Sequence, residues 1–212
     1  MSIVQRRPRG ETRAKLLDAA LDAFARHGFA GASIRAITRE VGVRESAFYA
    51  HFPSKRAVYD ELFAEAGPAV VTRLVAELPD EGAAEQVLPA LAQRILAAWA
   101  TRRARAFASV AVRESFGGNA ESRTALLNGI DGALRALAGR FAHFERLGTA
   151  DPHVLAYEFI APIVMARFLF FTIDASEAEM RRGEVLVAAH AASFAALLGA
   201  TRDRRRPSPS SR

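Results

Sequence analysis

The sequence predicts an all-α protein of about nine helices, in which a three-helix N-terminal unit precedes a larger helical body. Three observations favour this class. Apolar side chains recur with helical spacing along most of the chain, no stretch shows the alternation of a strand, and half of the 212 residues are hydrophobic. A chain of this length and composition can bury a sizeable core.

The first helix is expected over residues 11–27. Leu17, Leu21 and Phe24 fall on one of its faces, and Gly28 follows as a C-terminal stop. This face predicts where the N-terminal unit places its core.

Two short helices follow the first. Ser33 is placed as the N-cap of a helix that ends at Gly42, and the third helix is expected over residues 45–51. A longer helix from Ser54 to about residue 78 comes next. We expect it to bend at the Gly-Pro pair at 67–68, because proline removes a backbone donor and clashes with the preceding turn.

Five more helices are predicted, over residues 83–100, 103–115, 122–146, 152–173 and 177–199. The almost wholly apolar stretch 159–173 contains Arg167 and has 15 residues, fewer than the ~20 that span a bilayer. We therefore expect a buried helix there.

The distribution of charge separates the ends of the chain from its middle. Residues 1–64 carry 11 Lys or Arg against 7 acids, residues 65–200 carry 13 against 15, and residues 201–212 carry 5 against 1. A basic N-terminal unit on a near-neutral body indicates polyanion binding, with an ordinary solvated surface as the alternative. The Pro- and Ser-rich end after residue 201 is expected to be a disordered basic tail.

Several classes of site and location are disfavoured. The chain has no Cys, so disulfides, thiolate zinc sites and a cysteine nucleophile are excluded. The basic residues 1–10 have no apolar stretch behind them, so we expect no signal peptide and a cytoplasmic protein. Arg6, Arg7 and Arg9 suit either a disordered tail or an arm that reaches a minor groove.

The segment 33–55 has the pattern of a helix-turn-helix. Ile34, Ile37 and Val41 form an apolar stripe on its first helix, and Gly42 permits the left-handed turn. The second helix would then be presented outward, with its N-terminal residues able to reach base edges in a major groove.

Groups that contact phosphates follow this helix pair. Tyr49 and His51 supply a hydroxyl and an imidazole, and Ser54-Lys55 add a helix N-terminus and an ammonium. The chain before these groups carries Gly28, Ser33, Ile37 and Gly42-Val43. Together with Tyr49-Ala50-His51-Phe52 and Ser54-Lys55, these residues make the segment 11–65 resemble the DNA-binding domain of the TetR family of bacterial repressors.

The resemblance implies a role for each matching residue. Ser33, Tyr49, His51 and Lys55 would bind phosphates. Arg35, Glu45 and Ser46 would contact bases, and Arg44 could do either.

Two residues depart from the family pattern. Arg44 stands where a small residue begins the recognition helix, so the usual hydroxyl cap is missing and fraying is expected without DNA. Thr38 replaces a common Ala, and its hydroxyl can bond back to the Ile34 carbonyl. Glu45 beside phosphates would favour selectivity over affinity.

The last two helices, at 152–173 and 177–199, are expected to form a homodimer interface, the alternative being that they complete a monomer core. The final helix carries a seam of small residues at helical spacing: Val185, Ala189, Ala192, Ala196 and Gly199.

Aromatic and other large side chains of the body are candidates for a ligand pocket: Trp99, Phe107, Phe141, Phe144, Tyr157, Met165 and Phe168. They suggest a small hydrophobic effector. No cofactor or metal is expected, because the five His residues lack ligand spacing.

We therefore expect a DNA-binding transcriptional repressor that a small hydrophobic effector releases from its operator. The alternatives are a regulator without an effector and a small helical enzyme, which the absence of a phosphate loop and of a metalloprotease motif disfavours. Its predicted parts are a disordered N-terminus at 1–10, a DNA-binding domain at 11–55, a ligand-binding and dimerisation domain at 56–200, and a tail at 201–212.

Overall fold

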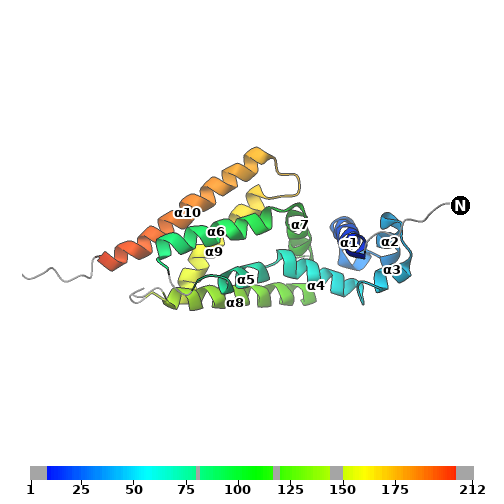
Figure 1. Cartoon of the computed structure of the whole chain (residues 1–212), viewed down its shortest axis with the longest axis horizontal. Coiled ribbons are helices and arrows are strands. Elements are labelled where there is room, and N and C mark those ends of the chain that lie inside the picture. Colours follow the sequence, from blue (N-terminus) through cyan, green and yellow to red (C-terminus); the bar gives the residue numbers. More distant parts are fainter. Residues whose placement is uncertain (1–8, 80–81, 117–119, 144–149, 204–212) are drawn as a thin grey trace, which may run out of the picture. The chain divides into compact units, whose positions relative to one another are not determined.

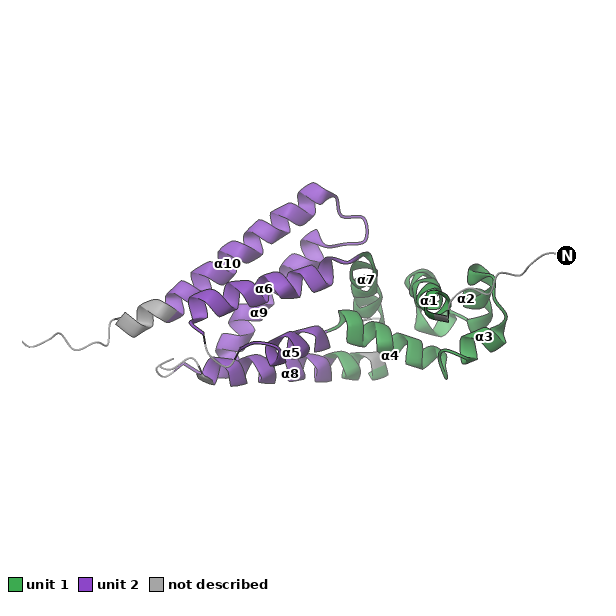
Figure 2. Cartoon of the chain, viewed as in Figure 1, with its two compact units in different colours: residues 1–67, 102–126 green, residues 68–101, 127–212 purple. Residues whose placement is uncertain are grey.

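The computed structural model describes residues 9–79, 82–116, 120–143 and 150–203, which form ten helices and no strand (Figure 1). The predicted all-α class is confirmed. The chain divides into two compact units (Figure 2). Unit 1 contains residues 1–67 and 102–126, and unit 2 contains residues 68–101 and 127–212.

Unit 1 holds the N-terminal helices together with one from the middle of the chain. Its helices are α1 (Arg9–Gly31), α2 (Ile34–Val41), α3 (Glu45–Tyr49), α4 (Lys55–Ala66) and α7 (Arg102–Phe116), followed by the first residues of α8 (Ala120–His143). The predicted face of α1 is buried, with Leu17, Leu21 and Phe24 all at most 3% exposed. They share a core with Phe107 of α7, which the sequence had assigned to the body. Unit 1 therefore includes an element distant in sequence.

The break within α1 lies at Gly28, where the sequence predicts the end of the first helix. Gly28 adopts φ 71° and ψ 169°, a conformation that is essentially restricted to glycine, and a helical turn then continues to Gly31. The Gly28 carbonyl accepts a hydrogen bond from the Ala32 amide at 3.1 Å. A Cβ added at Gly28 would lie 3.0 Å from Oε1 of Glu114. The backbone conformation thus requires glycine here, and an added Cβ would also press against the Glu114 carboxylate.

Gly28→Ala is expected to lower the free energy of unfolding by about 1–3 kcal/mol, the usual cost of forcing such a backbone conformation on a side chain. Urea unfolding followed by circular dichroism measures this change. Gly31→Ala is the control, because its added Cβ would meet only the His27 Cβ at 3.4 Å, an ordinary contact. Equal unfolding midpoints for the two variants would contradict the assignment.

The helix predicted from Ser54 to about residue 78 is two helices rather than one bent helix. α4 ends at Ala66, and α5 (Ala69–Ala76) begins after Pro68. Gly67 is extended, at φ −84° and ψ −166°, because a residue before proline avoids the helical region. The break coincides with the division between the units.

Unit 2 packs α5, α6 (Ala84–Ala100), α9 (Pro152–Phe170) and α10 (Glu177–Asp203) with the rest of α8. α10 packs along both α6 and α9. Its buried stripe is Val187, Ala191 and Ala195, at the i, i+4, i+8 spacing of one helix face. The core between these helices includes Leu137 and Phe159.

α9 is long and apolar enough to cross a membrane by length and composition, and 33% of its most apolar window is buried in the structure. Core helices of globular proteins meet the same criteria. Its side with Leu155, Phe159 and Ile163 packs into the core of unit 2. The predicted buried helix is thus buried on one side, and its other side is exposed.

Candidate nucleic-acid interface

Hydrogen bonds of the local backbone build the α2–α3 pair. The Ser33 side chain accepts from the Ala36 amide at 3.2 Å and caps α2. Gly42 ends α2 in the left-handed region, at φ 74°, and the next amide, of Val43, donates to the Thr38 carbonyl at 3.0 Å. The Thr38 hydroxyl donates to the Ile34 carbonyl at 3.0 Å, as predicted. The turn therefore forms from residues that are close in sequence.

α3, the predicted recognition helix, has only five residues, two fewer than the range 45–51 predicted. Arg44 occupies its N-cap in an extended conformation and makes no side-chain cap hydrogen bond, as the departure from the family pattern indicated. Phe48 is 0% exposed and Phe52 is 2% exposed, with ring centroids 5.7 Å apart. Because a free helix of this length is unstable in water, these two rings hold α3 in place.

The side chains predicted to contact DNA lie around this anchor in unit 1. Six of them are exposed: Ser33, Arg35, Arg44, Glu45, Ser46 and Tyr49. His51 and Lys55 are half-buried. The ring of Tyr49 is 56% exposed, whereas the adjacent Phe48 is fully buried, so neighbouring aromatic residues face opposite ways. The surface around α3 thus presents donors, acceptors and guanidinium groups.

Lys55 has partners that sequence reasoning missed. Its ammonium donates to the carbonyls of Phe29 at 2.5 Å and Ala32 at 2.7 Å, and it lies 4.6 Å from the centroid of the Phe29 ring. Burial lowers the pKa of Lys55, and the charge of Glu114 opposes this shift. The side chain therefore ties the start of α4 to the segment between α1 and α2.

Glu114 of α7 holds the same segment from another side. Its carboxylate accepts from the Phe29 amide at 2.9 Å, and neighbouring Arg113 donates to the Ala25 carbonyl at 3.0 Å. Some 85 residues separate these partners, and no local sequence pattern could reveal them. Together, Glu114 and Lys55 fix the chain that leads into α2.

Arg39 is a further basic residue of the candidate interface, beyond those predicted from the sequence. It follows Arg35 by four residues on α2, so both lie on one helix face, and both are exposed. Neither has an ion pair with any residue the structure describes. The neighbouring acid Glu40 instead pairs with Arg26 at 2.9 Å, which reduces its repulsion of a phosphate backbone. The i, i+4 spacing was the available signal for Arg39.

The structure does not bring the candidate pocket residues together. Trp99 and Phe141 are buried in unit 2, whereas Phe107 is buried in unit 1. Phe144 lies outside the described residues. The three candidates on α9 are exposed, namely Tyr157, Met165 and Phe168.

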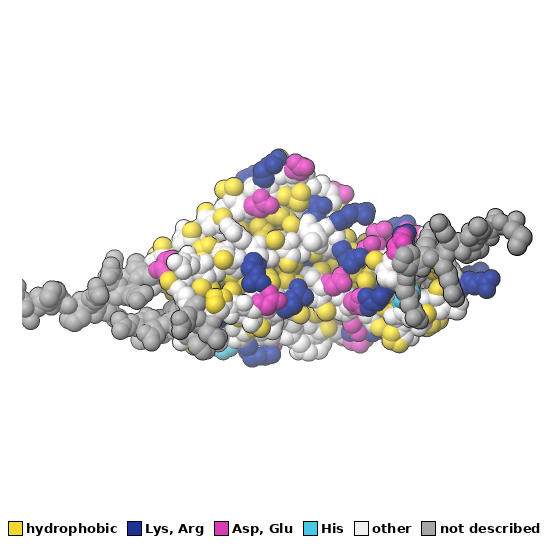
Figure 3. Space-filling view, in the orientation of Figure 1, with side chains coloured by type: hydrophobic (Ala, Val, Ile, Leu, Met, Phe, Trp, Pro, Cys, Tyr) yellow, Lys and Arg dark blue, Asp and Glu magenta, His cyan; other side chains and the backbone are white. Residues whose placement is uncertain are grey.

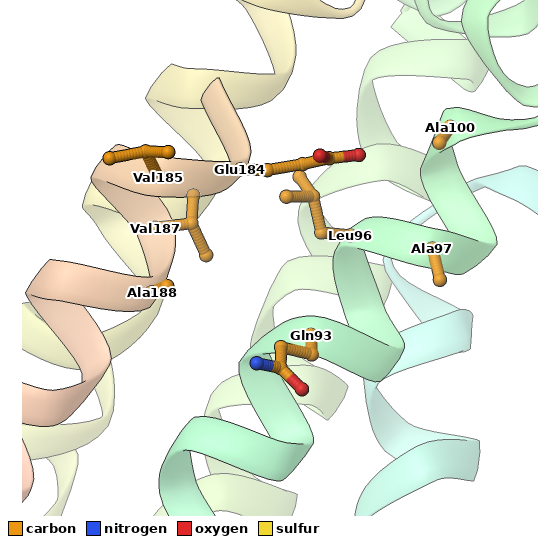
Figure 4. A pocket seen from close by; sticks show the side chains of 8 residues that line it. All are labelled: Gln93, Leu96, Ala97, Ala100, Glu184, Val185, Val187 and Ala188. Carbon is orange, nitrogen blue, oxygen red and sulfur yellow. The ribbon is translucent and has the colours of Figure 1, made fainter. Parts of the chain in front are cut away.

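A groove of about 410 Å³ lies between α6 and α10 (Figure 4). Its lining is Gln93, Leu96, Ala97, Ala100, Glu184, Val185, Val187 and Ala188. No sequence pattern indicates this groove, because small side chains from two helices distant in sequence form most of it.

Residues 16–62 match the family model described as bacterial regulatory proteins, tetR family. No curated relative is similar enough in sequence to match the chain. Solved structures of the same fold include a TetR-family regulator from Mesorhizobium loti at 20% identity, covering 91% of this chain and 98% of that one with a TM-score of 0.61. GusR of Salmonella enterica is 19% identical, with 93% and 97% covered and a TM-score of 0.66.

Fold and family match together define a DNA-binding transcriptional regulator of the helix-turn-helix class. Over residues 16–62 the chain matches the TetR family, and solved structures of TetR-family regulators share its fold. This confirms the family resemblance of residues 11–65 and the expectation of a regulator rather than an enzyme.

Proposed function

We propose that the protein is a repressor that binds its operator as a homodimer and that a small apolar effector releases it. One observation carries the DNA-binding part. Phe48 and Phe52 are buried and anchor α3 in the core of unit 1. Arg35, Arg44 and Tyr49 are exposed around this anchor and are therefore accessible to DNA. Residues 11–55 would be the DNA-binding part and residues 56–200 the ligand-binding and dimerisation part, within the cytoplasm.

Ser33, Tyr49 and His51 would hold phosphates in this proposal. The ammonium of Lys55 would attract the phosphates of the bound DNA strand while it still donates a hydrogen bond to a backbone carbonyl of the protein. Arg35, Glu45 and Ser46 would contact base edges. Arg44 and the additional Arg39 would lie beside the sugar-phosphate backbone of the DNA.

Fluorescence anisotropy tests DNA binding with two duplexes, one random and one from the region upstream of the gene. The upstream duplex is expected to bind more tightly, and its affinity should fall steeply between 50 and 200 mM salt, because phosphate contacts release counterions. Tyr49→Ala should weaken binding to both duplexes about equally. Equal affinity of the wild-type protein for both duplexes would contradict a repressor role.

The homodimer would form through α9 and α10. Apolar residues are exposed on both helices, namely Val154, Tyr157, Met165, Phe168, Leu169, Val185, Leu186 and Leu197. Figure 3 shows apolar side chains at the surface along α10. The predicted seam residues Ala189, Ala192 and Ala196 are exposed on the same helix, away from its buried stripe. An apolar surface of this extent is typical of a protein interface.

Met165→Arg is expected to shift the protein from dimer to monomer, because it buries a charge without a partner in the proposed interface. Sedimentation velocity measures the change. Leu127→Arg on α8 is the control, since Leu127 is 50% exposed and Met165 is 58% exposed. A dimer that persists in Met165→Arg and dissociates in Leu127→Arg would place the interface elsewhere.

The effector would be apolar and would act on unit 2, where Trp99 and Phe141 are buried. FadR of Bacillus subtilis, solved in complex with stearoyl-CoA, shares the fold at 18% identity, with 87% and 96% covered and a TM-score of 0.55. In the proposed mechanism, the free dimer spaces its recognition helices roughly 34–36 Å apart, and the effector selects another spacing. A thermal-shift screen with apolar compounds tests this part. If no stabilising compound releases DNA, the regulator without an effector is favoured.

A further inference from the structure

The groove between α6 and α10 lies within unit 2 and is mainly apolar (Figure 4). Its volume of about 410 Å³ falls within the ~300–1,000 Å³ that small-molecule sites occupy. No aromatic side chain lines it. Six of its eight lining side chains are aliphatic, namely Leu96, Ala97, Ala100, Val185, Val187 and Ala188. The groove therefore suits an aliphatic chain.

Glu184 supplies the only charge among the described residues of the lining. It is exposed on α10 and extends toward α6 across the groove (Figure 4). Its carboxylate has no ion pair with any residue that the structure describes. Gln93, the other polar residue of the lining, is neutral. An occupant would therefore meet one negative charge beside an apolar surface.

The nearby guanidinium groups have acidic partners other than Glu184. On α10, Arg181 precedes Glu184 by one turn and lies 3.5 Å from the carboxylate of Glu177. On α6, Arg94 pairs with Glu77. These pairs leave the Glu184 carboxylate available to a cation from solution.

We propose that the groove binds a primary alkylamine, whose ammonium pairs with Glu184 and whose hydrocarbon chain covers the apolar lining. An ammonium carries one positive charge and N–H donors, and a carboxylate accepts hydrogen bonds. A quaternary ammonium has no N–H group and is usually bound by aromatic rings, which this lining lacks. An anionic head group would be repelled by Glu184. That this amine is the effector rests on the proposed function; that it binds here does not.

Calorimetry of the full-length protein tests the site with three compounds that share an eight-carbon chain: octylammonium chloride, 1-octanol and sodium octanoate. Octylammonium should bind up to about fivefold more tightly than octanol, as expected for an exposed ion pair, and octanoate should bind most weakly. The chain has a formal net charge of +6, so nonspecific attraction would favour octanoate instead. The expected order thus separates Glu184 from the overall charge.

Glu184→Gln should remove the preference for octylammonium and leave octanol binding unchanged. Glu177→Gln is the matched control, because it makes the same change in charge at an exposed position of α10 outside the lining. It should keep the wild-type order of the three compounds. Ala97→Phe should weaken all three by filling the groove, and it should fold normally, because Ala97 is exposed.

The site should not depend on the proposed dimer. Val185 borders both the groove and the apolar surface proposed for the homodimer, whereas Met165 does not line the groove. Met165→Arg should therefore bind octylammonium as the wild-type protein does. Loss of binding in this variant would overturn a site formed by α6 and α10 of one chain.

Three further results would overturn the site: octanoate binding as tightly as octylammonium, the same loss of preference in Glu177→Gln as in Glu184→Gln, or unchanged binding in Ala97→Phe. DNA binding is measured in parallel by anisotropy. Octylammonium binding without release of DNA would support the site and contradict the effector part of the proposed function. Selective DNA binding without octylammonium binding would overturn the site alone.

Discussion

Phe48→Ala is expected to lower the free energy of unfolding by about 3–5 kcal/mol, the usual range for removing a buried aromatic ring. Phe48 is fully buried and packs against Phe52, and α3 has no side-chain cap. Since small domains are stable by only about 5–15 kcal/mol, this is a large share. DNA affinity should also fall, because α3 would no longer be held. Urea unfolding and anisotropy measure the two effects.

Tyr49→Ala is the control for this experiment. It removes an aromatic ring from the adjacent position of the same helix, but that ring is 56% exposed. Its unfolding free energy should change by about 0.5 kcal/mol or less, although DNA affinity should fall. Comparable loss of stability in the two variants would show that burial does not separate the anchoring ring from the DNA-facing one.

Arg35→Ala is expected to weaken binding to the operator and to change the preferred sequence. A bidentate contact between arginine and a base contributes about 1–3 kcal/mol of discrimination, and a symmetric dimer would make the contact in each half-site. The expected loss is therefore about 2–6 kcal/mol for a palindromic operator. Anisotropy measures the affinity, and selection from random DNA identifies the new preference.

Arg181→Ala makes the same change in charge on α10, where Arg181 is exposed, and should leave the selected sequence unchanged. Glu45→Gln should alter the preference at another position, because an amide donates where a carboxylate only accepts. If wild type, Arg35→Ala and Glu45→Gln all select the same site, these residues do not contact bases.

Features that depend on nearby residues were predictable from the sequence. Ser33 as a cap, Gly42 as a left-handed turn and the Thr38 bond to the Ile34 carbonyl all form within five residues. The same holds for Gly28, whose position after an apolar periodic segment indicated a helix stop. Local geometry determines these features, so the sequence pattern is sufficient.

Features that depend on distant residues were not predictable. The placement of Phe107 in unit 1, and the binding of Glu114 to the Phe29 amide, follow from how α7 packs. The carbonyl contacts of Lys55 arise in the same way, although its identity suggested only a phosphate contact. The break at Gly67-Pro68 was located correctly, but the sequence pattern predicted one bent helix where the structure has two separate helices.

The separation of buried anchoring residues from exposed residues around α3 has a consequence for how such a protein could change the operator that it binds. Phe48 and Phe52 hold the helix, while Arg44, Glu45, Ser46 and Tyr49 are exposed and contribute little to the core. Substitutions on the outer face should therefore be nearly neutral for folding. A duplicated copy of the gene could acquire a new operator by changes at these positions without first having to regain stability.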